Sequence, residues 1–140
     1  MNNDTIFITS HTVRSYELDS FGHVNNAIFM NFLERARGDY LVQKNLKFND
    51  FSVWNKFPLV FKASIEFKYP ANADDVLTIK GWFSSNSVTR FSIRYEISLQ
   101  ENSRIIATAE TQHVFVDENN KPTRMPKIFA EKFLTQINCK

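Results

Sequence analysis

The eight residues from Asp19 to Asn26, DSFGHVNN, hold a carboxylate, a glycine, an imidazole and two carboxamides, and an apolar segment follows them directly. Carboxylates and imidazoles transfer protons or attack as nucleophiles in many hydrolytic reactions. The same residue types also build turns and helix caps. The stretch is therefore either a turn before a helix or part of an active site, and the surrounding elements have to distinguish the two.

A long helix is expected immediately after this stretch, over residues 26–44. Its apolar residues fall at helical spacings, and two further apolar residues widen the arc beyond one stripe: Phe29, Phe32, Leu33, Ala36, Tyr40 and Leu41, with Ile28 and Met30. A helix that is apolar over most of its circumference is a buried one. Asn25 is the expected N-cap, because its side-chain oxygen can accept from an early helical N–H.

The start of this helix would give Asp19 a chemical partner. The first backbone N–H groups of a helix have no partner inside it and lie at the positive end of its dipole, where they favour an oxygen that gains negative charge. Asp19 lies seven residues before Asn26, in a loop that Gly22 allows to bend sharply. A carboxylate facing such N–H groups is the arrangement that acyl transfer requires.

The rest of the chain predicts a sheet around the helix. Strand-like runs cover residues 6–18 (with an interruption near Ser10–His11), 58–69, 76–84, 88–100 and 104–116, and a short helix is expected over 127–137. Residues 45–57 read as irregular. The last two long runs are joined by a short turn and should be antiparallel neighbours. The fold class is α+β, an antiparallel sheet wrapped around one long central helix, with free edges that favour a dimer.

Length and composition restrict the possible functions. The chain has 140 residues, which suits a single domain over 1–140, and it is rich in phenylalanine. Its net charge of +2 is too small to favour nucleic acid as a partner. The lone cysteine, Cys139, suits a reducing cytoplasm. No apolar run is long enough to suggest a signal peptide or a membrane span, so we expect no membrane association.

The segment LDSFGHVNNAIFMNFLERAR resembles the Asp-x-x-Gly-His-Val-Asn-Asn…Glu-x-Ala-Arg motif of acyl-CoA thioesterases of the 4-hydroxybenzoyl-CoA thioesterase type, which have the hotdog fold. The AETQHVFVD strand and the NKPTRMP turn extend the resemblance over nearly the whole chain. It implies a thioester hydrolase in which Asp19 is the catalytic carboxylate and the backbone N–H of Asn26 polarises the thioester carbonyl. Coenzyme A would be part of the substrate, and no separate cofactor is expected.

The family pattern also implies an assembly and further site residues. Members of this type form side-by-side dimers with one continuous sheet, commonly pair again as homotetramers, and place their active sites at subunit interfaces. Glu34 stands where another branch of the superfamily has its catalytic glutamate. Arg90 matches a region where relatives place cations against the phosphates of coenzyme A.

Each of these residues could also have a purely structural role instead of a functional one. His23 can act as a general base or can orient Asp19, and Gly22 and Asn25 can support substrate binding or simply form the turn and the helix cap. Glu34 can form an ion pair with an arginine, either in its own chain or in a neighbouring subunit, or can position water or substrate. Arg90 can be a solvated strand charge.

The two remaining histidines lack an acid or thiol at the spacing of a metal site. They are His11 and His113, and both are expected at the surface or at an interface.

Two alternative functions stay open beside the thioesterase. A non-catalytic acyl-CoA sensor would bind the same ligand without turnover. An enoyl-CoA hydratase of this fold pairs an aspartate with a histidine five residues later, whereas here the spacing from Asp19 to His23 is four. Within the thioesterase hypothesis, the sequence leaves open whether Asp19 attacks or activates water, and whether the carrier is coenzyme A or acyl carrier protein.

Overall fold

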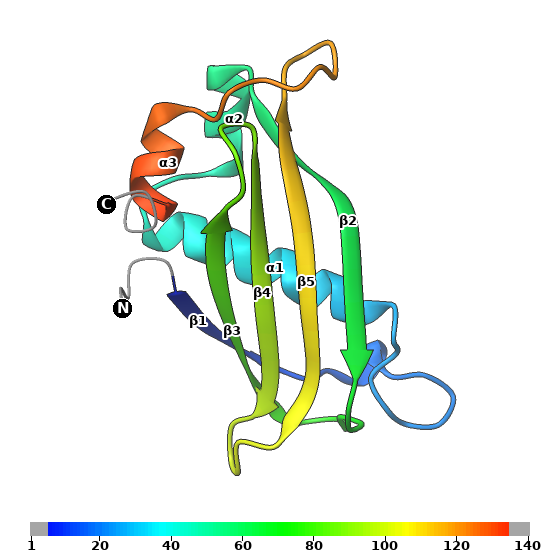
Figure 1. Cartoon of the computed structure of the whole chain (residues 1–140). Helices are drawn as coiled ribbons and strands as arrows, with labels where there is room; N and C mark the ends of the chain where they lie inside the picture. Colours follow the sequence, from blue (N-terminus) through cyan, green and yellow to red (C-terminus); the bar gives the residue numbers. More distant parts are fainter. Residues whose placement is uncertain (1–5, 135–140) are drawn as a thin grey trace.

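The computed structural model describes residues 6–134. Five strands and three helices follow the order strand, helix, helix, four strands, helix (Figure 1). In chain order they are β1 (Ile6–Thr12), α1 (Ile28–Gln43), α2 (Phe48–Trp54), β2 (Phe57–Phe67), β3 (Val76–Ser85), β4 (Arg90–Leu99), β5 (Ile105–Val116) and α3 (Lys127–Phe133), with a 3-10 turn at Ser15–Glu17. No helix within the described residues is long and apolar enough to cross a membrane.

The five strands form one antiparallel sheet in the order β1-β3-β4-β5-β2. Helix α1 crosses one face of this sheet, and α3 lies near one end of it (Figure 1). β4 and β5 are antiparallel neighbours, as the short connection between them predicted. The predicted α+β arrangement of a sheet with one long helix is thus confirmed, and β2 is left as an edge strand.

The core lies between α1 and the sheet. Alternate residues of β3 and β4 are buried, as expected for strands with one face against a helix. At one contact, Phe7 of β1 lies over Gly81 of β3, and its ring stacks on Tyr40 of α1 with the ring centroids 4.7 Å apart. The absent side chain of Gly81 makes room for the Phe7 ring and so lets the helix approach the sheet.

Four sequence predictions about the elements need correction. β1 runs without a break through Ser10–His11 and ends at Thr12, because the chain then turns into the 3-10 segment. Helix α1 begins at Ile28 rather than Asn26, and residues 48–54 form a helix within the segment predicted to be irregular. Helix α1 is also not buried all round: its buried residues lie on one side, and Glu34 is among those exposed on the other.

The short C-terminal helix begins at Lys127, as predicted. Residues 135–137 of the predicted helix, and Cys139, lie outside the described residues.

Candidate active site

The loop that carries Asp19 is a closed turn between two paired residues, Leu18 and Val24. The backbone N–H of Asp19 donates to the carbonyl oxygen of His23 at 2.7 Å, and the N–H of Gly22 donates to the carbonyl oxygen of Asp19 at 3.1 Å. Gly22 has a φ of 85°, in the left-handed region that a residue with a Cβ adopts only under strain. The sharp bend that the sequence predicted at Gly22 is therefore present.

The carboxylate of Asp19 uses one oxygen to hold this turn. Its Oδ1 accepts hydrogen bonds from the backbone N–H groups of Phe21 at 2.9 Å and His23 at 3.3 Å. Within residues 6–134, Oδ2 has no hydrogen-bond partner. The turn-forming and catalytic readings of Asp19 are thus compatible, because one oxygen fixes the carboxylate in place while the other is left for a ligand.

The start of α1 leaves a backbone donor beside this loop. The side chain of Asn25 accepts from the N–H of Ala27 at 2.9 Å, and its carbonyl oxygen accepts from the N–H of Ile28 at 2.9 Å. Asn25 therefore closes the turn just before α1, but the prediction that it is the N-cap was wrong, because α1 begins two residues later than expected and its N-cap position is Ala27, which has no side-chain cap. Across the described part of the chain, the N–H of Asn26 has no acceptor.

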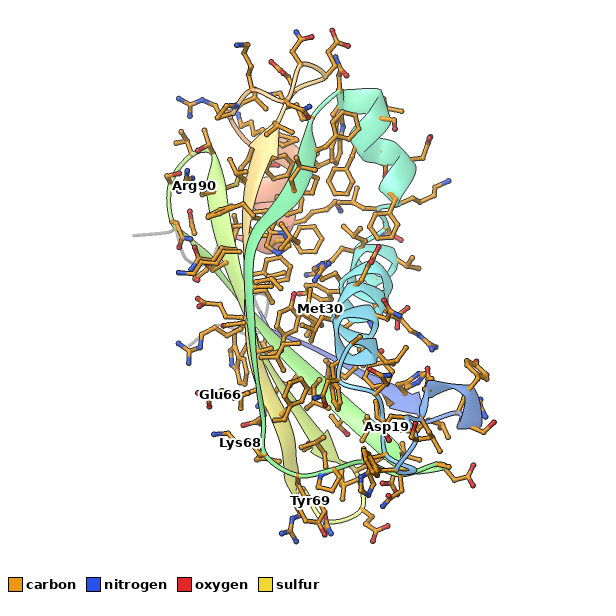
Figure 2. All side chains as sticks on the ribbon, turned by 90° about the vertical axis from the view of Figure 1, so that its right-hand side faces the viewer. Asp19, Met30, Glu66, Lys68, Tyr69 and Arg90 are labelled. Carbon is orange, nitrogen blue, oxygen red and sulfur yellow. The ribbon has the colours of Figure 1, made fainter. Side chains whose placement is uncertain are left out.

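Asp19, His23 and Asn26 line one cavity of about 270 Å³. The other lining residues come from the end of the loop, from the first turn of α1, and from the end of β2 with the turn that follows it: Val24, Phe29, Phe67, Lys68, Tyr69, Pro70 and Ala71. Figure 2 shows Asp19 and Tyr69 toward the same end of the molecule. The structure thus brings three of the predicted catalytic residues together, at a site where apolar and aromatic groups also gather.

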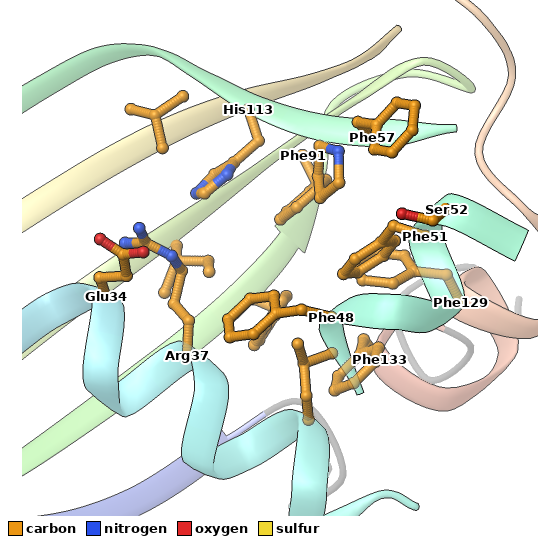
Figure 3. Close-up of a pocket in the computed structure, with 15 residues that line it drawn as sticks. Glu34, Arg37, Phe48, Phe51, Ser52, Phe57, Phe91, His113, Phe129 and Phe133 are labelled. Atoms are coloured by element: carbon orange, nitrogen blue, oxygen red, sulfur yellow. The ribbon is translucent and has the colours of Figure 1, made fainter. Parts of the chain in front are cut away.

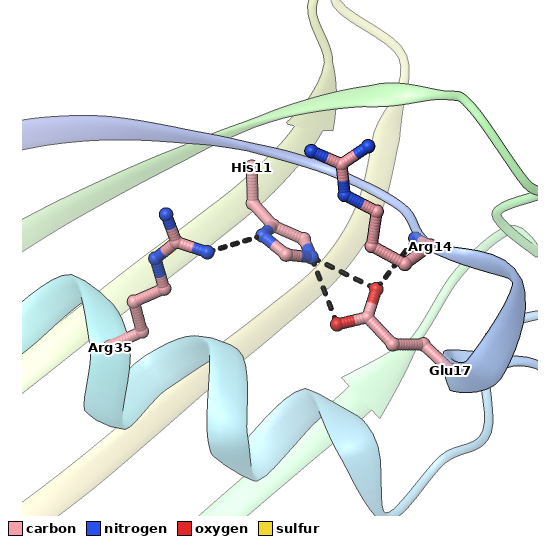
Figure 4. A network of polar contacts seen from close by, with 4 residues as sticks. All are labelled: His11, Arg14, Glu17 and Arg35. Atoms are coloured by element: carbon pink, nitrogen blue, oxygen red, sulfur yellow. Dashed lines mark hydrogen bonds and ion pairs between the residues drawn. The ribbon is translucent and has the colours of Figure 1, made fainter.

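A partly buried polar network joins β1 and α1 to the segment that leads into the loop (Figure 4). Arg35 donates to His11 Nδ1 at 2.9 Å, so that nitrogen is an acceptor and the imidazole carries its proton on Nε2. Nε2 in turn lies 2.9 Å and 3.1 Å from the two carboxylate oxygens of Glu17. Glu17 also accepts from the backbone N–H of Arg14 at 2.8 Å, and its carbonyl oxygen accepts from the N–H of Asn25 at 2.9 Å.

This network corrects the prediction for His11, which is only 9% exposed rather than at the surface. Sequence reasoning missed Glu17, two residues before Asp19. The available signal was an acid at the end of a strand-like run that also carries a histidine, but only the fold shows that the chain turns back at Val13 and brings the two together.

Among residues 6–134, Glu34 forms no ion pair, contrary to the predicted pairing with an arginine of its own chain. Arg35 pairs with Asp39 at 3.8 Å, and Arg37 donates to the Tyr95 hydroxyl at 3.0 Å, so both arginines have other acceptors. Glu34 itself is exposed on α1. It lies at the rim of a second cavity and not beside Asp19.

Arg90 lies toward the opposite end of the molecule from Asp19 (Figure 2). Its guanidinium stands over the ring of Phe61 on the edge strand, 4.7 Å from the ring centroid. Within one protomer it therefore does not reach the Asp19 cavity, and its assignment to substrate binding stays a prediction. Among residues 6–134, no three His, Cys, Asp or Glu side chains are grouped as a metal site would require.

The second cavity has a volume of about 320 Å³ and a largely aromatic lining (Figure 3). Its walls come from α1, α2, α3 and the sheet: Glu34, Arg37, Leu41, Phe48, Phe51, Ser52, Phe57, Pro58, Val60, Phe83, Phe91, Ile93, His113, Phe129 and Phe133. A concave, apolar site with a few polar groups is typical of small-molecule binding. It shares no lining residue with the Asp19 cavity, and the two touch opposite ends of β2.

The prediction for His113 was also wrong, because the residue is only 2% exposed. It projects from the buried face of β5 and stacks on Phe91 with the ring centroids 4.5 Å apart. Burial of the ring and, to a smaller extent, the positive charge of Arg37 together lower the pKa of His113 to about 3. The imidazole is therefore neutral at ordinary pH.

Comparison with known proteins places these features in a family. The chain matches the Thioesterase-like superfamily over residues 13–133. It is 31% identical to the long-chain acyl-CoA thioesterase FadM of Escherichia coli over 78% of this chain and 82% of that protein. It is 27% identical over 87% of its length to the acyl-acyl carrier protein thioesterase ATL3 of Arabidopsis thaliana.

The structure compares in the same way. It superposes on Slr0204, a 1,4-dihydroxy-2-naphthoyl-CoA thioesterase from Synechocystis, with a TM-score of 0.87, 26% identity and coverage of 91% of this chain and 95% of that one. The chain spans only 64% and 61% of the length of the two matching Arabidopsis thioesterases. The match to the family nevertheless covers most of this chain. On both sequence and structure, the chain belongs to the thioesterase-like superfamily and has the hotdog fold.

Proposed function

We propose that this protein hydrolyses an acyl thioester to the free acid and a thiol, at the cavity between Asp19 and the start of α1. The observation that carries the proposal is the pairing of two unused groups in one cavity, Oδ2 of Asp19 and the backbone N–H of Asn26. One is a base or nucleophile, and the other is a hydrogen-bond donor at a helix start. The thioesterases among its relatives support the same chemistry.

In this mechanism the thioester carbonyl oxygen accepts a hydrogen bond from the N–H of Asn26. As negative charge develops on that oxygen, the helix dipole and the N–H stabilise it, and one such donor is worth about 3–4 kcal/mol of the barrier. Asp19 then either attacks the carbonyl carbon to form a mixed anhydride that water opens, or takes a proton from the attacking water. In both routes the thiolate leaves and is protonated.

His23 fits the orienting role in this mechanism. Its backbone N–H and carbonyl oxygen both bond Asp19, through the Oδ1 and the N–H of that residue respectively. Asp19 therefore keeps its position relative to α1 without help from the imidazole ring. His23 lines the cavity, and its imidazole makes no hydrogen bond to the other described residues.

A second copy of the chain is part of the proposal, because β2 leaves one edge of the sheet unpaired. Edge strands with exposed apolar residues are prone to pair with another chain. β2 is 11 residues long, and Leu59, Val60, Phe61 and Phe67 are 45%, 39%, 46% and 46% exposed. We infer that two copies join along β2 into one continuous sheet, and that two such dimers associate as a homotetramer in the cytoplasm.

This pairing would join the two cavities. If two β2 strands run antiparallel about their midpoint, Lys62, then Phe67 of one copy lies opposite Phe57 of the other. Phe67 lines the Asp19 cavity and Phe57 lines the aromatic cavity. The acyl group of a thioester held at Asp19 would then enter the aromatic cavity of the second copy, and Arg90, which stacks on Phe61, would lie near the seam.

The test is a thiol-release assay of the purified protein with acyl groups of graded length, each offered on coenzyme A and on acyl carrier protein. We expect turnover well above the uncatalysed rate with at least one series, and the better carrier identifies the physiological class. Tight binding of acyl-CoA without thiol release would refute the hydrolase and favour the sensor.

Sedimentation velocity tests the assembly. We expect a dimer or a tetramer for the wild type, and monomers when Phe61→Glu places a charge on the edge strand. A fully active wild-type monomer would contradict the shared site.

A further inference from the structure

A chain of hydrogen bonds beside the aromatic cavity, with both of its end residues in the cavity lining, is not used by the proposed hydrolysis. Arg37 on α1 lies 3.0 Å from the hydroxyl of Tyr95, this hydroxyl lies 2.7 Å from Oγ1 of Thr111, and Oγ1 lies 2.8 Å from Nε2 of His113. Tyr95 and Thr111 are buried, and Arg37 and His113 both line the cavity. Figure 3 shows His113 on the wall opposite α1, facing the side where Arg37 and Glu34 lie.

The direction of this chain follows from what each group can donate. A guanidinium has only donors, so the Tyr95 oxygen accepts from Arg37. The Tyr95 hydroxyl then donates its hydrogen to Thr111, and the Thr111 hydroxyl donates to Nε2 of His113. In the reverse direction the Tyr95 hydrogen would have no acceptor among the described residues, and a buried donor without an acceptor is costly.

His113 is therefore left with its proton on Nδ1. Nε2 accepts from Thr111, and a neutral imidazole carries one proton, so Nδ1 is the donor. Nδ1 has an accessible surface of less than 1 Å², and it is the one buried side-chain nitrogen or oxygen in the described part of the chain that lacks a partner. Buried polar groups are nearly always paired, so an acceptor is missing here.

The geometry points to a substrate whose acyl group carries an uncharged oxygen, such as a keto or hydroxyl group, that accepts a hydrogen bond from Nδ1–H of His113. This inference rests on the proposed thioesterase function and assigns the aromatic cavity to the acyl group. The oxygen would supply the acceptor that the cavity lacks, while the phenylalanines around it, among them Phe48, Phe91 and Phe129, bind the hydrocarbon.

The cavity disfavours a charged oxygen at this position. His113 is neutral, and the guanidinium of Arg37 is already engaged with Tyr95. A carboxylate among phenylalanine rings would lose its hydration without gaining a full counter-charge. Glu34 at the rim would also repel it.

The experiment compares acyl-CoA substrates of equal length that differ only in an oxygen. Each plain chain is paired with chains that carry a keto or a hydroxyl group at successive positions, and kcat/KM is measured for all. In the wild type we expect at least one oxygenated chain, in both its keto and its hydroxyl form, to exceed the plain chain by roughly tenfold, the value of pairing one buried donor.

Three variants separate the role of His113 from general effects on the cavity. His113→Leu removes the donor and should abolish the preference while plain chains are still hydrolysed. Thr111→Val frees Nε2 to carry the proton and should reduce the preference without removing the ring. Ile93→Val, an apolar change in the same lining, should alter the rates of both chains equally and keep the preference.

A binding measurement makes the inference independent of turnover. Calorimetric titration of the same pairs onto Asp19→Asn should show the same preference in Kd, and it should disappear in Asp19→Asn/His113→Leu. If the wild type hydrolyses no thioester, the proposed function fails, whereas this titration still decides the inference about the cavity. Three results would overturn the inference: equal affinity for plain and oxygenated chains, a preference shown by hydroxyl chains but not by keto chains, or a preference that survives His113→Leu.

Discussion

The contact between Phe7 and Gly81 yields a sharp test of how α1 is seated on the sheet. A Cβ placed on Gly81 would lie 2.3 Å from both Cε1 and Cζ of Phe7 and 3.1 Å from Cδ1. Carbon atoms in good contact lie about 3.5–4.0 Å apart, so the ring would have to shift by about 1 Å or more. Phe7 is 3% exposed and packs against Tyr40, Phe83 and Tyr95, so little space is available for that shift.

Gly81→Ala should therefore destabilise the fold. Overpacking of this kind costs about 1–3 kcal/mol, and the smaller unfolded-state entropy of alanine offsets about 0.4–1 kcal/mol of it. We expect the free energy of unfolding to fall by about 1–2 kcal/mol, which for a domain of this size lowers Tm by roughly 3–8 °C. Urea titration should show a lower midpoint with an unchanged m-value.

Gly38→Ala provides the matched control. Its Cβ would meet the ring of Phe48 at 3.1 Å and 3.3 Å, but that ring is 58% exposed and can rotate away. Alanine within α1 should then be neutral or stabilising by up to about 1 kcal/mol. Phe7→Leu in the Gly81→Ala background should recover part of the loss, since it removes the clashing atoms. Equal stability of Gly81→Ala and the wild type would refute the reasoning.

Three further predictions concern the site. Glu17→Ala leaves the His11 Nε2–H and the Arg14 N–H without their acceptor, so it should lower the free energy of unfolding by about 2 kcal/mol, which thermal unfolding would show. It should also lower kcat more than it raises KM in steady-state kinetics. The pKa of His113 is lowered to about 3 in the fold, below its unfolded value of about 6.5. The contribution of the neutral His113 to stability is therefore complete above about pH 6.5 and is lost as the pH falls toward 3, so the free energy of unfolding drops by roughly 1.4 kcal/mol per pH unit. Denaturation at several pH values should show a smaller drop in His113→Leu. Asn26→Pro removes the backbone N–H two residues before α1, where that N–H makes no hydrogen bond to the described residues, and should lower kcat by about 100-fold or more. Asn26→Ala keeps the N–H and should stay within a few-fold of the wild type.

The sequence predicted the parts of the fold that follow from local periodicity. The alternation in β4 and the spacing of Phe29, Phe32 and Ala36 correctly indicated a strand with one buried face and a long helix. The turn at Gly22 was also predictable, because glycine adopts a positive φ at little cost, whereas the N-cap lies at Ala27 and not at Asn25. The prediction that α1 is buried all round was wrong. Ile28 and Met30 suggested it, but Ile28 is only half-buried and Met30 is exposed, as is Glu34.

The buried histidines could not be placed from the sequence. His11 and His113 sit in strand patterns like those of surface residues, and their partners are Glu17 and Arg35 for one, Thr111 for the other. The pairs with Glu17 and Arg35 form because the chain turns back after β1 and because α1 crosses the sheet beside it. Such contacts depend on tertiary packing, which local periodicity does not contain.

The proposed hydrolysis requires the carboxylate of Asp19 to be held opposite the start of α1, so the most direct test is the kcat of Asp19→Asn. Asparagine keeps an oxygen that can accept from the N–H groups of Phe21 and His23, so the turn should survive, and circular dichroism and Tm would check this. Loss of the base or nucleophile should lower kcat by about 100-fold or more on the best thioester substrate. A folded Asp19→Asn protein that hydrolyses this substrate at the wild-type rate would contradict the central claim.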